Sequence, residues 1–243
     1  MSTWPRLSKA PIVEGLIDIR VEPSASASGT ALKAAADELA AEFPSRSELH
    51  AFVAQFQIAP TPPAPALTTA DTPQGFILRS LDEKWVAQFR VDGFTVSRLH
   101  PYSDWEELKT KTAALWSRYL AAAKPAKVVR IACRYINRVP LPVGESFDKT
   151  FLTSFAVGPS LPQSVAGYLL RVALPFEEQN ALAILTQSLE GNATDCILDI
   201  DVFSENPQGI DQASLWDKLG NLRDIKNRIF FGSFTEAALE RFK

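Results

Sequence analysis

The chain has 243 residues, of which 46% are hydrophobic, and its 25 Lys and Arg residues are set against 28 Asp and Glu, for a formal net charge of -3. This apolar fraction excludes disorder for most of the chain and supports one large domain or two modest ones. The balanced charge gives no general attraction to nucleic acid or anionic membranes. No apolar run approaches the roughly 20 residues of a membrane span, so a cytoplasmic protein is expected.

The first half predicts a strand, a helix and several antiparallel strands, closed by a long helix. In the opening strand Ile17 and Ile19 alternate with Asp18 and Arg20, which is the two-residue period of a half-buried strand. The elements predicted are a strand at 11–22, a helix at 30–43 capped by Ser28 or Thr30, a strand at 49–58, an exposed proline-rich loop at 59–73, strands at 75–81, 84–91 and 93–99, and a helix opened by a capping box at 103–106 and ending near 123.

From residue 127 the same order of elements begins again. The elements predicted are a strand at 127–139, a short helix at 146–155, strands at 165–174, 181–189 and 196–203, a helix at 214–229 and one or two further turns at 235–242. Both halves are therefore read as strand, helix, three strands, long helix, with the strand at 49–58 as an addition in the first half. The sequence predicts an α+β fold of two tandem β-α-β-β-β-α units, residues 1–124 and 125–243, with helices packed on one face of antiparallel sheet. Whether the halves share one sheet is left open.

Signatures of metal and nucleophile chemistry are missing from the sequence. His50 and His100 have no Cys or carboxylate at ligand spacing, and Cys133 and Cys196 each lie alone in an apolar strand. With 11 glycines and no phosphate-binding loop or Gly-x-Ser-x-Gly turn, common nucleotide-binding folds are disfavoured. We therefore predict no metal and no cofactor. Trp4, ahead of the first strand, is expected to pack across a partner chain.

Charged side chains on the outer strand faces are the candidate site. One interpretation is a solvated face on which Arg and Asp pair across strands. The other is a concave surface where Arg134, Asn137 and Arg138 bind an anion, although Asn137 has the opposite parity and needs a bulge or strand end. Asp199 and Asp201 could also hold a cation. The candidate residues are Asp18, Arg20, Arg130, Arg134, Asn137, Arg138, Asp199 and Asp201.

Three segments of the chain resemble a sporadically distributed bacterial protein family of similar length. They are the start Leu7 to Arg20, the central Arg134-Tyr-Ile-Asn-Arg138 and the end Leu222 to Phe231. The resemblance implies no reaction, cofactor or catalytic residue, and the sporadic distribution implies accessory loci such as defence or toxin–antitoxin neighbourhoods. The closing segment of such proteins often carries a His where this chain has Arg223 or Asp224. The positions that match are Pro11, Glu14, Asp18, Arg20, Tyr135, Asn137, Arg138 and Phe230.

Three functions are weighed on this basis. The leading one is a non-catalytic binding protein, expected to form a homodimer, which holds a protein partner or a small anionic ligand on the charged sheet face. The second is a hydrolase or nuclease-like enzyme that uses Asp199, Asp201 and either Glu14 or Asp18 around a divalent cation. The third is nucleic-acid binding through a saddle-like sheet. The acidic segment at 195–201 disfavours this third function because it would repel phosphates.

Overall fold

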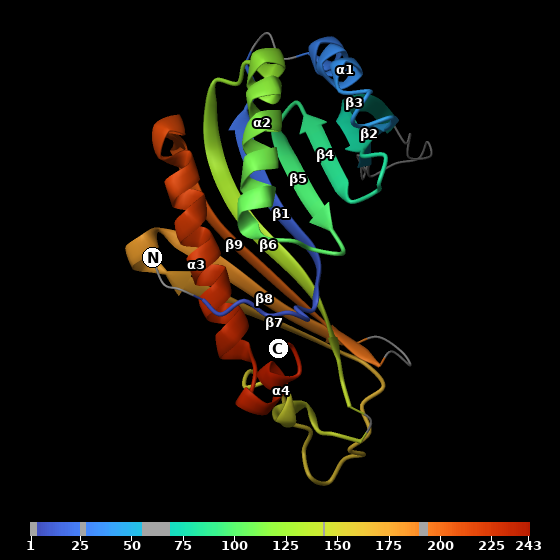
Figure 1. Ribbon diagram of the computed structural model, residues 1–243, viewed down its shortest axis with the longest axis vertical. Coiled ribbons are helices and arrows are strands. Elements are labelled where there is room, and N and C mark those ends of the chain that lie inside the picture. Colours follow the sequence, from blue (N-terminus) through green and yellow to red (C-terminus); the bar gives the residue numbers. More distant parts are fainter. Residues whose placement is uncertain (1–3, 25–27, 55–68, 143, 190–193) are drawn as a thin grey trace, which may run out of the picture.

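The computed structural model describes residues 4–24, 28–54, 69–142, 144–189 and 194–243. These residues form an α+β fold in which nine strands make one antiparallel sheet, in the order β2-β3-β4-β5-β1-β6-β9-β8-β7 (Figure 1). The predicted fold class and the antiparallel pairing are confirmed. Among the described residues, no helix is both long enough and apolar enough to cross a bilayer.

The elements follow the predicted order closely. The strands are β1 (Ile12–Glu22), β2 (Ser45–Ala54), β3 (Thr69–Arg79), β4 (Trp85–Arg90), β5 (Gly93–Leu99), β6 (Lys127–Pro140), β7 (Tyr168–Phe176), β8 (Ala181–Leu189) and β9 (Asp195–Ile210). The α-helices are α1 (Gly29–Glu38), α2 (Trp105–Ala123), α3 (Leu215–Ser233) and α4 (Glu236–Glu240), with short 3-10 turns at Phe147–Lys149, Glu177–Gln179 and Gln212–Ser214.

The two halves share one sheet, because the first strand of each half lies at its centre. β1 and β6 pair antiparallel along almost their whole length, from Ile12 opposite Asn137 to Glu22 opposite Lys127. On its other side each of these strands pairs with the last strand of its own half, β1 with β5 and β6 with β9. Backbone pairing therefore continues across the boundary at residue 124, with irregularities in β1 between Ile12 and Glu14 and between Arg20 and Val21.

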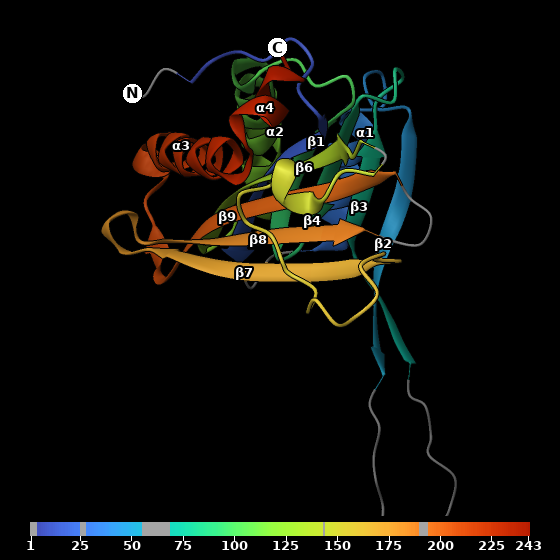
Figure 2. The same ribbon diagram turned by 90° about the horizontal axis from the view of Figure 1, so that it is seen from below.

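The core lies between this sheet and the helices. α2 packs on β5 and β1, α3 packs on β6 and β9, and α1 packs on β3. Figure 1 shows α2 and α3 crossing in front of the sheet, and Figure 2 shows them on the same side of it. The rings of Trp116 and Tyr119 on α2 lie 5.5 and 5.4 Å from the ring of Phe94 on β5, measured between centroids. Trp85, Trp105 and Trp116 are buried in this core, and Trp216 is partly buried against it.

Two predictions in the first half need correction. The helix predicted at 30–43 ends at Glu38, because the next backbone amides bond three residues back and tighten the chain into turns. Of the predicted loop at 59–73, residues 69–73 belong to β3 and the remainder lies outside the described residues. Among the described residues this part of β3 pairs with β2 alone, so Pro73 disrupts no second ladder.

The predicted N-cap of α1 is confirmed, and the predicted N-cap of α2 needs correction. Ser28 caps α1 by accepting a hydrogen bond from the Ala31 amide, as expected. The N-cap of α2 is Asp104 instead of Ser103, since its carboxylate accepts from the Glu107 amide at 2.9 Å. Both are N-cap residue types, so the sequence located this helix start to within one position.

The second half departs from the predicted layout where a helix was expected at 146–155. Only one 3-10 turn forms, at Phe147–Lys149, because the backbone beyond it bonds to the end of α3. The Leu152 amide donates to the Ser233 carbonyl at 2.9 Å, and Phe151 forms an isolated bridge with Phe234. The first half has four strands after its helix instead of three. The two halves therefore differ in their secondary-structure elements.

Candidate functional site

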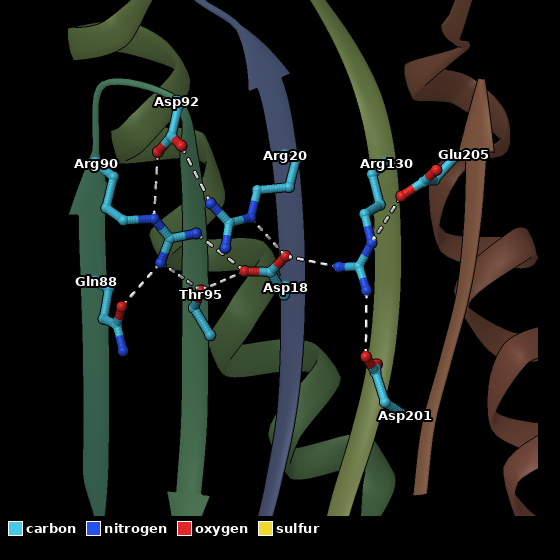
Figure 3. Close-up of polar contacts among 9 residues, drawn as sticks. All are labelled: Asp18, Arg20, Gln88, Arg90, Asp92, Thr95, Arg130, Asp201 and Glu205. Carbon is cyan, nitrogen blue, oxygen red and sulfur yellow. Dashed lines mark hydrogen bonds and ion pairs between the residues drawn. The ribbon is translucent and has the colours of Figure 1, made fainter. Parts of the chain in front are cut away.

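Strand parity places a row of charged side chains on the face opposite α2 and α3, which we call the charged face. In β1, Ile17 and Ile19 are fully buried in the core under the helices. The alternate residues Asp18 and Arg20 point to the other face, since successive side chains of a strand point in opposite directions. Figure 3 shows the charged side chains in front of the strands, with a helix behind.

Sheet register brings these side chains together from five strands. Asp18 lies opposite Thr95 of β5, and Arg20 lies opposite both Gly93 of β5 and Arg130 of β6. Gly93 carries no side chain at the point where arginines from β1 and β4 converge. A Cβ there would lie 2.8 Å from the Ile19 carbonyl oxygen and 3.0 Å from atoms of both arginine side chains. The tight turn that joins β4 to β5 is therefore also part of the site.

Asp18 is the centre of the network. Its Oδ2 accepts hydrogen bonds from Arg90 Nη2 at 3.0 Å and Thr95 Oγ1 at 2.7 Å. Its Oδ1 accepts from Arg20 Nε and Arg130 Nη1, both at 3.1 Å (Figure 3). Burial alone would raise the pKa of Asp18, but the Thr95 hydrogen bond and the charges of Arg90 and Arg20 outweigh it and hold that pKa below its usual value.

Arg130 links this centre to the second half of the sheet. Its Nη2 donates to Asp201 Oδ2 at 3.3 Å, and its Nε lies 3.4 Å from Glu205 Oε1. The guanidinium carbon also lies 4.3 Å from the centroid of the Phe203 ring, which fixes the plane of the group. Through Asp18 and Asp201, this one arginine connects strands β1, β6 and β9.

Arg134 forms a separate pair next to this network. Its Nε and Nη2 donate to the two carboxylate oxygens of Asp199 at 2.9 and 2.5 Å, which is a bidentate arrangement. Its side chain is 42% exposed, close to the 41% of Arg20. Arg20 and Arg134 are thus more accessible to solvent than Arg130, whose side chain is 20% exposed, and Arg90, whose side chain is only 8% exposed.

Asp201 is the least satisfied carboxylate of the site. One oxygen accepts from Arg130, but Oδ1 is buried and has no hydrogen-bond partner among the described residues. Burial raises the pKa of Asp201, and the nearby Asp199 and Asp18 raise it further, against the lowering effect of Arg130 and Arg134. A raised pKa means that this carboxylate takes up a proton at a higher pH than an ordinary aspartate does.

A concave pocket of about 480 Å³ lies over this network. Four arginines and only two aspartates line it, so its wall carries an excess of positive charge. Leu16 and Ala132 form the apolar part of the wall, and Ala132 leaves space because its side chain is short. The charged residues in the lining are Asp18, Arg20, Arg90, Arg130, Arg134 and Asp201.

Two of the predicted residues lie elsewhere. Asn137 is fully buried with the parity of the core, and its amide donates to the Leu198 carbonyl at 3.0 Å. The irregularity next to Asn137 lies in β1, between Ile12 and Glu14, so the parity of β6 is kept and Asn137 is not turned to the charged face. Arg138 is exposed on the same strand as Arg134 but lines a different hollow, near Pro11 and Phe242.

Several members of the network are absent from the predicted site, although their signal is present in the sequence. Gln88 and Arg90 alternate with apolar residues of β4, as Asp18 does in β1, and the turn Asp92-Gly93 follows at once. Arg90 Nη1 donates to Gln88 Oε1 at 2.8 Å and to Thr95 Oγ1 at 2.9 Å. Asp92 accepts from Arg20 at 3.1 Å.

The two aspartates nominated for a cation are engaged with arginines. Asp199 accepts both of its hydrogen bonds from Arg134, and Asp201 is bound by Arg130. In the part of the chain that the structure describes, no group of three or more His, Cys, Asp or Glu residues is placed to hold a metal ion.

Comparisons with known proteins add no further assignment. The chain matches no protein-family model, and curated proteins give no significant match. The resemblance in the three sequence segments therefore stays a prediction. The class that the fold and the site define is an α+β protein with an arginine-lined pocket on its sheet.

Proposed function

We propose that this protein is a non-catalytic binding protein that holds an anionic group in the pocket of the charged face. The observation that carries the proposal is the lining of four arginines against two aspartates in one concave site. Arg20 and Arg134 supply the accessible cations, and guanidinium groups bind carboxylate and phosphate oxygens through paired N–H donors. The pairs with Asp18 and with Asp199 hold Arg20 and Arg134 in place, respectively, so a ligand needs little rearrangement to bind.

A small anion is favoured over the other two functions. The cation-dependent hydrolase needs free carboxylates, whereas Asp199 and Asp201 are both bound to arginine. Nucleic-acid binding needs a phosphate-attracting surface, whereas Asp92, Asp199 and Glu205 ring the arginines and would repel an extended phosphate backbone. A single compact anion approaches fewer of these carboxylates than an extended phosphate backbone does.

The test is isothermal titration with citrate and inorganic pyrophosphate at low ionic strength. We expect at least one of them to bind, and we expect Arg20→Gln and Arg134→Gln each to weaken that binding by about tenfold, the loss of one charge-assisted pair. Arg138→Gln is the matched control, since Arg138 lies on the same strand outside the pocket and should not matter. The proposal is contradicted if neither anion binds, or if Arg138→Gln weakens binding as much as Arg20→Gln and Arg134→Gln do.

We also propose the finer organisation expected from the sequence. Two tandem units, 1–124 and 125–243, are supported by the way the first strand of each half pairs with the last strand of that half. Formation of a homodimer, a cytoplasmic location and an accessory role in defence or toxin–antitoxin loci are part of the same proposal. Packing across a partner is not needed for Trp4, because its ring stacks on Phe231 of the same chain.

A further inference from the structure

A second cavity, of about 410 Å³, lies on the helix side of the sheet and is independent of the charged face. It is enclosed by the N-terminal segment, the start of α2 and one side of α3. Figure 1 shows the N-terminal segment running past α3 toward β1. The Lys9 amide donates to the Phe242 carbonyl at 2.9 Å, which ties this segment to the end of the chain. Apolar side chains supply most of the walls, and they include Trp4, Leu7, Trp105, Phe230 and Phe231.

A lysine without a carboxylate partner lines this apolar cavity. Lys226 on α3 is 7% exposed, and its ammonium donates to Asn227 Oδ1 at 2.5 Å. The nitrogen lies 3.9 Å from the centroid of the Tyr135 ring, and within the described residues it forms no ion pair. Burial lowers the pKa of Lys226 to about 8, so the group is still mainly charged at neutral pH. A buried ammonium with one hydrogen bond is costly unless something else compensates it.

Two further donors converge on the same cavity. Arg223 lies one turn before Lys226 on α3 and also lines it, at 3.9 Å from its nearest carboxylate oxygen, on Asp224. The indole nitrogen of Trp4 is buried and has no hydrogen-bond partner among the described residues. The only carboxylate of the lining, Asp104, accepts a backbone hydrogen bond as the cap of α2. The cavity therefore holds an excess of donors and of positive charge.

The floor of the cavity is positioned by a glycine. The hydroxyl groups of Tyr102 and Tyr135 lie 2.6 Å apart, and their rings meet edge to face at 5.3 Å. A Cβ at Gly15 would come within 2.8 Å of both rings, so only a glycine in β1 allows this pair. The Tyr135 ring is thereby held under the Lys226 ammonium. The arrangement is rigid, which favours a site for a ligand of defined shape.

We infer that this cavity binds a small carboxylic acid with an apolar, ring-sized body, whose carboxylate pairs with Lys226 and Arg223. The ammonium and the planar guanidinium, one helical turn apart, match the two oxygens of a carboxylate. The indole, phenyl and tyrosyl side chains cover the body of the acid, and 410 Å³ is ample space for one or two fused rings. The ligand supplies the charge that the buried lysine lacks.

The test is isothermal titration with naphthalene-2-carboxylate and, as its uncharged match, naphthalene-2-carboxamide, at pH 7. We expect the carboxylate to bind at least tenfold more tightly than the amide. Lys226→Met keeps the length of the side chain and removes the charge, so it should weaken carboxylate binding by tenfold or more and leave amide binding nearly unchanged. Lys218→Met, on an exposed side of the same helix, is the control and should bind as the wild type does.

A second readout locates the ligand without relying on the stability of that variant. The ¹³Cε shift of Lys226 in labelled protein reports its pKa, which we expect to rise on saturation with the carboxylate because an anion stabilises the ammonium. Burial keeps the neighbouring Cys133 thiol and the Tyr135 phenol neutral throughout this range. An unchanged Lys226 pKa, equal affinity for acid and amide, or weaker naphthoate binding in Arg20→Gln would overturn the inference. The last result would mean that the ligand binds on the charged face, and it would then be evidence about the function proposed for the charged face only.

Discussion

At the scale of the residue, two buried charged groups, Asp18 and Lys226, have opposite surroundings. Asp18 receives four hydrogen bonds, three of them from arginines, and its pKa is lowered. Lys226 has no carboxylate partner among the described residues, and its pKa is also lowered, which for a base disfavours the charged form. Charge compensation inside the protein makes Asp18 a structural group, whereas Lys226 is left with capacity for an external anion.

Asp18→Asn should destabilise the protein by about 3 kcal/mol at pH 7, the scale of removing one partner from a buried ion pair. Because the pKa of Asp18 is depressed in the folded state, its contribution is complete above the unfolded value of 3.8 and is lost as the pH falls through the lower folded value. The stability difference between wild type and variant should therefore shrink toward pH 2. Urea unfolding followed by tryptophan fluorescence measures it.

The control for this prediction is Asp92→Asn. Asp92 binds two of the same arginines, but its side chain is 51% exposed, so we expect a loss below about 1 kcal/mol. Equal losses for the two variants would show that Asp18 is not the centre of the network.

At the scale of the element, the β4–β5 hairpin sets the geometry of the charged face. Its turn is short enough to place Arg90 directly beside Gly93, and β5 then presents that glycine to Arg20 of β1. Glycine is required at position 93 because a Cβ would come too close to the Ile19 carbonyl and to the side chains of Arg20 and Arg90. The place of this residue next to the turn is a lesser reason. Strand pairing and the arginine network are thus coupled at one position.

Gly93→Ala should destabilise the protein by about 1–3 kcal/mol, since the new methyl group would lie 2.8 Å from a backbone oxygen that strand pairing holds in place. It should also weaken anion binding, because Arg20 and Arg90 must shift. Thermal unfolding and the titrations described above measure both effects. Gly220→Ala is the contrasting variant: nothing lies within 4 Å of its Cβ, and alanine in a helix should stabilise by up to about 1 kcal/mol. A neutral Gly93→Ala would contradict this account.

At the scale of the whole molecule, the β1–β6 pairing joins the halves into one cooperative sheet. If the chain is divided at residue 124, β1 and β6 each become a sheet edge with unpaired backbone groups and fully buried side chains such as Ile17 and Ile131 at the break. We expect neither fragment, 1–124 or 125–243, to fold as a monomer, and we expect them to associate when co-expressed. Dispersed NMR spectra and monomeric mass for either isolated fragment would contradict this expectation.

Local patterns in the sequence were sufficient for the elements and for the parity of most charged residues. The alternation in β1 placed Asp18 and Arg20 on one face of the strand and Ile17 and Ile19 on the other, and the Asp92-Gly93 turn predicted the hairpin. These features follow from backbone geometry with a period of two or from one dipeptide, so they need no knowledge of distant segments. The failure at 146–155, where a helix was expected, arose because this segment pairs with residues far along the chain.

The sequence by itself determined an α+β chain of near-neutral charge whose strands carry arginines and aspartates away from the core. Only the tertiary structure decided which of these meet: that Asp18 lies among Arg20, Arg90 and Arg130, that Asn137 is turned inward, and that Lys226 is buried with no carboxylate partner in the part of the chain that the structure describes. The physical reason is that parity is a local property of the backbone. The neighbours across a sheet or beneath a helix depend instead on strand order, which is set by packing of the whole chain.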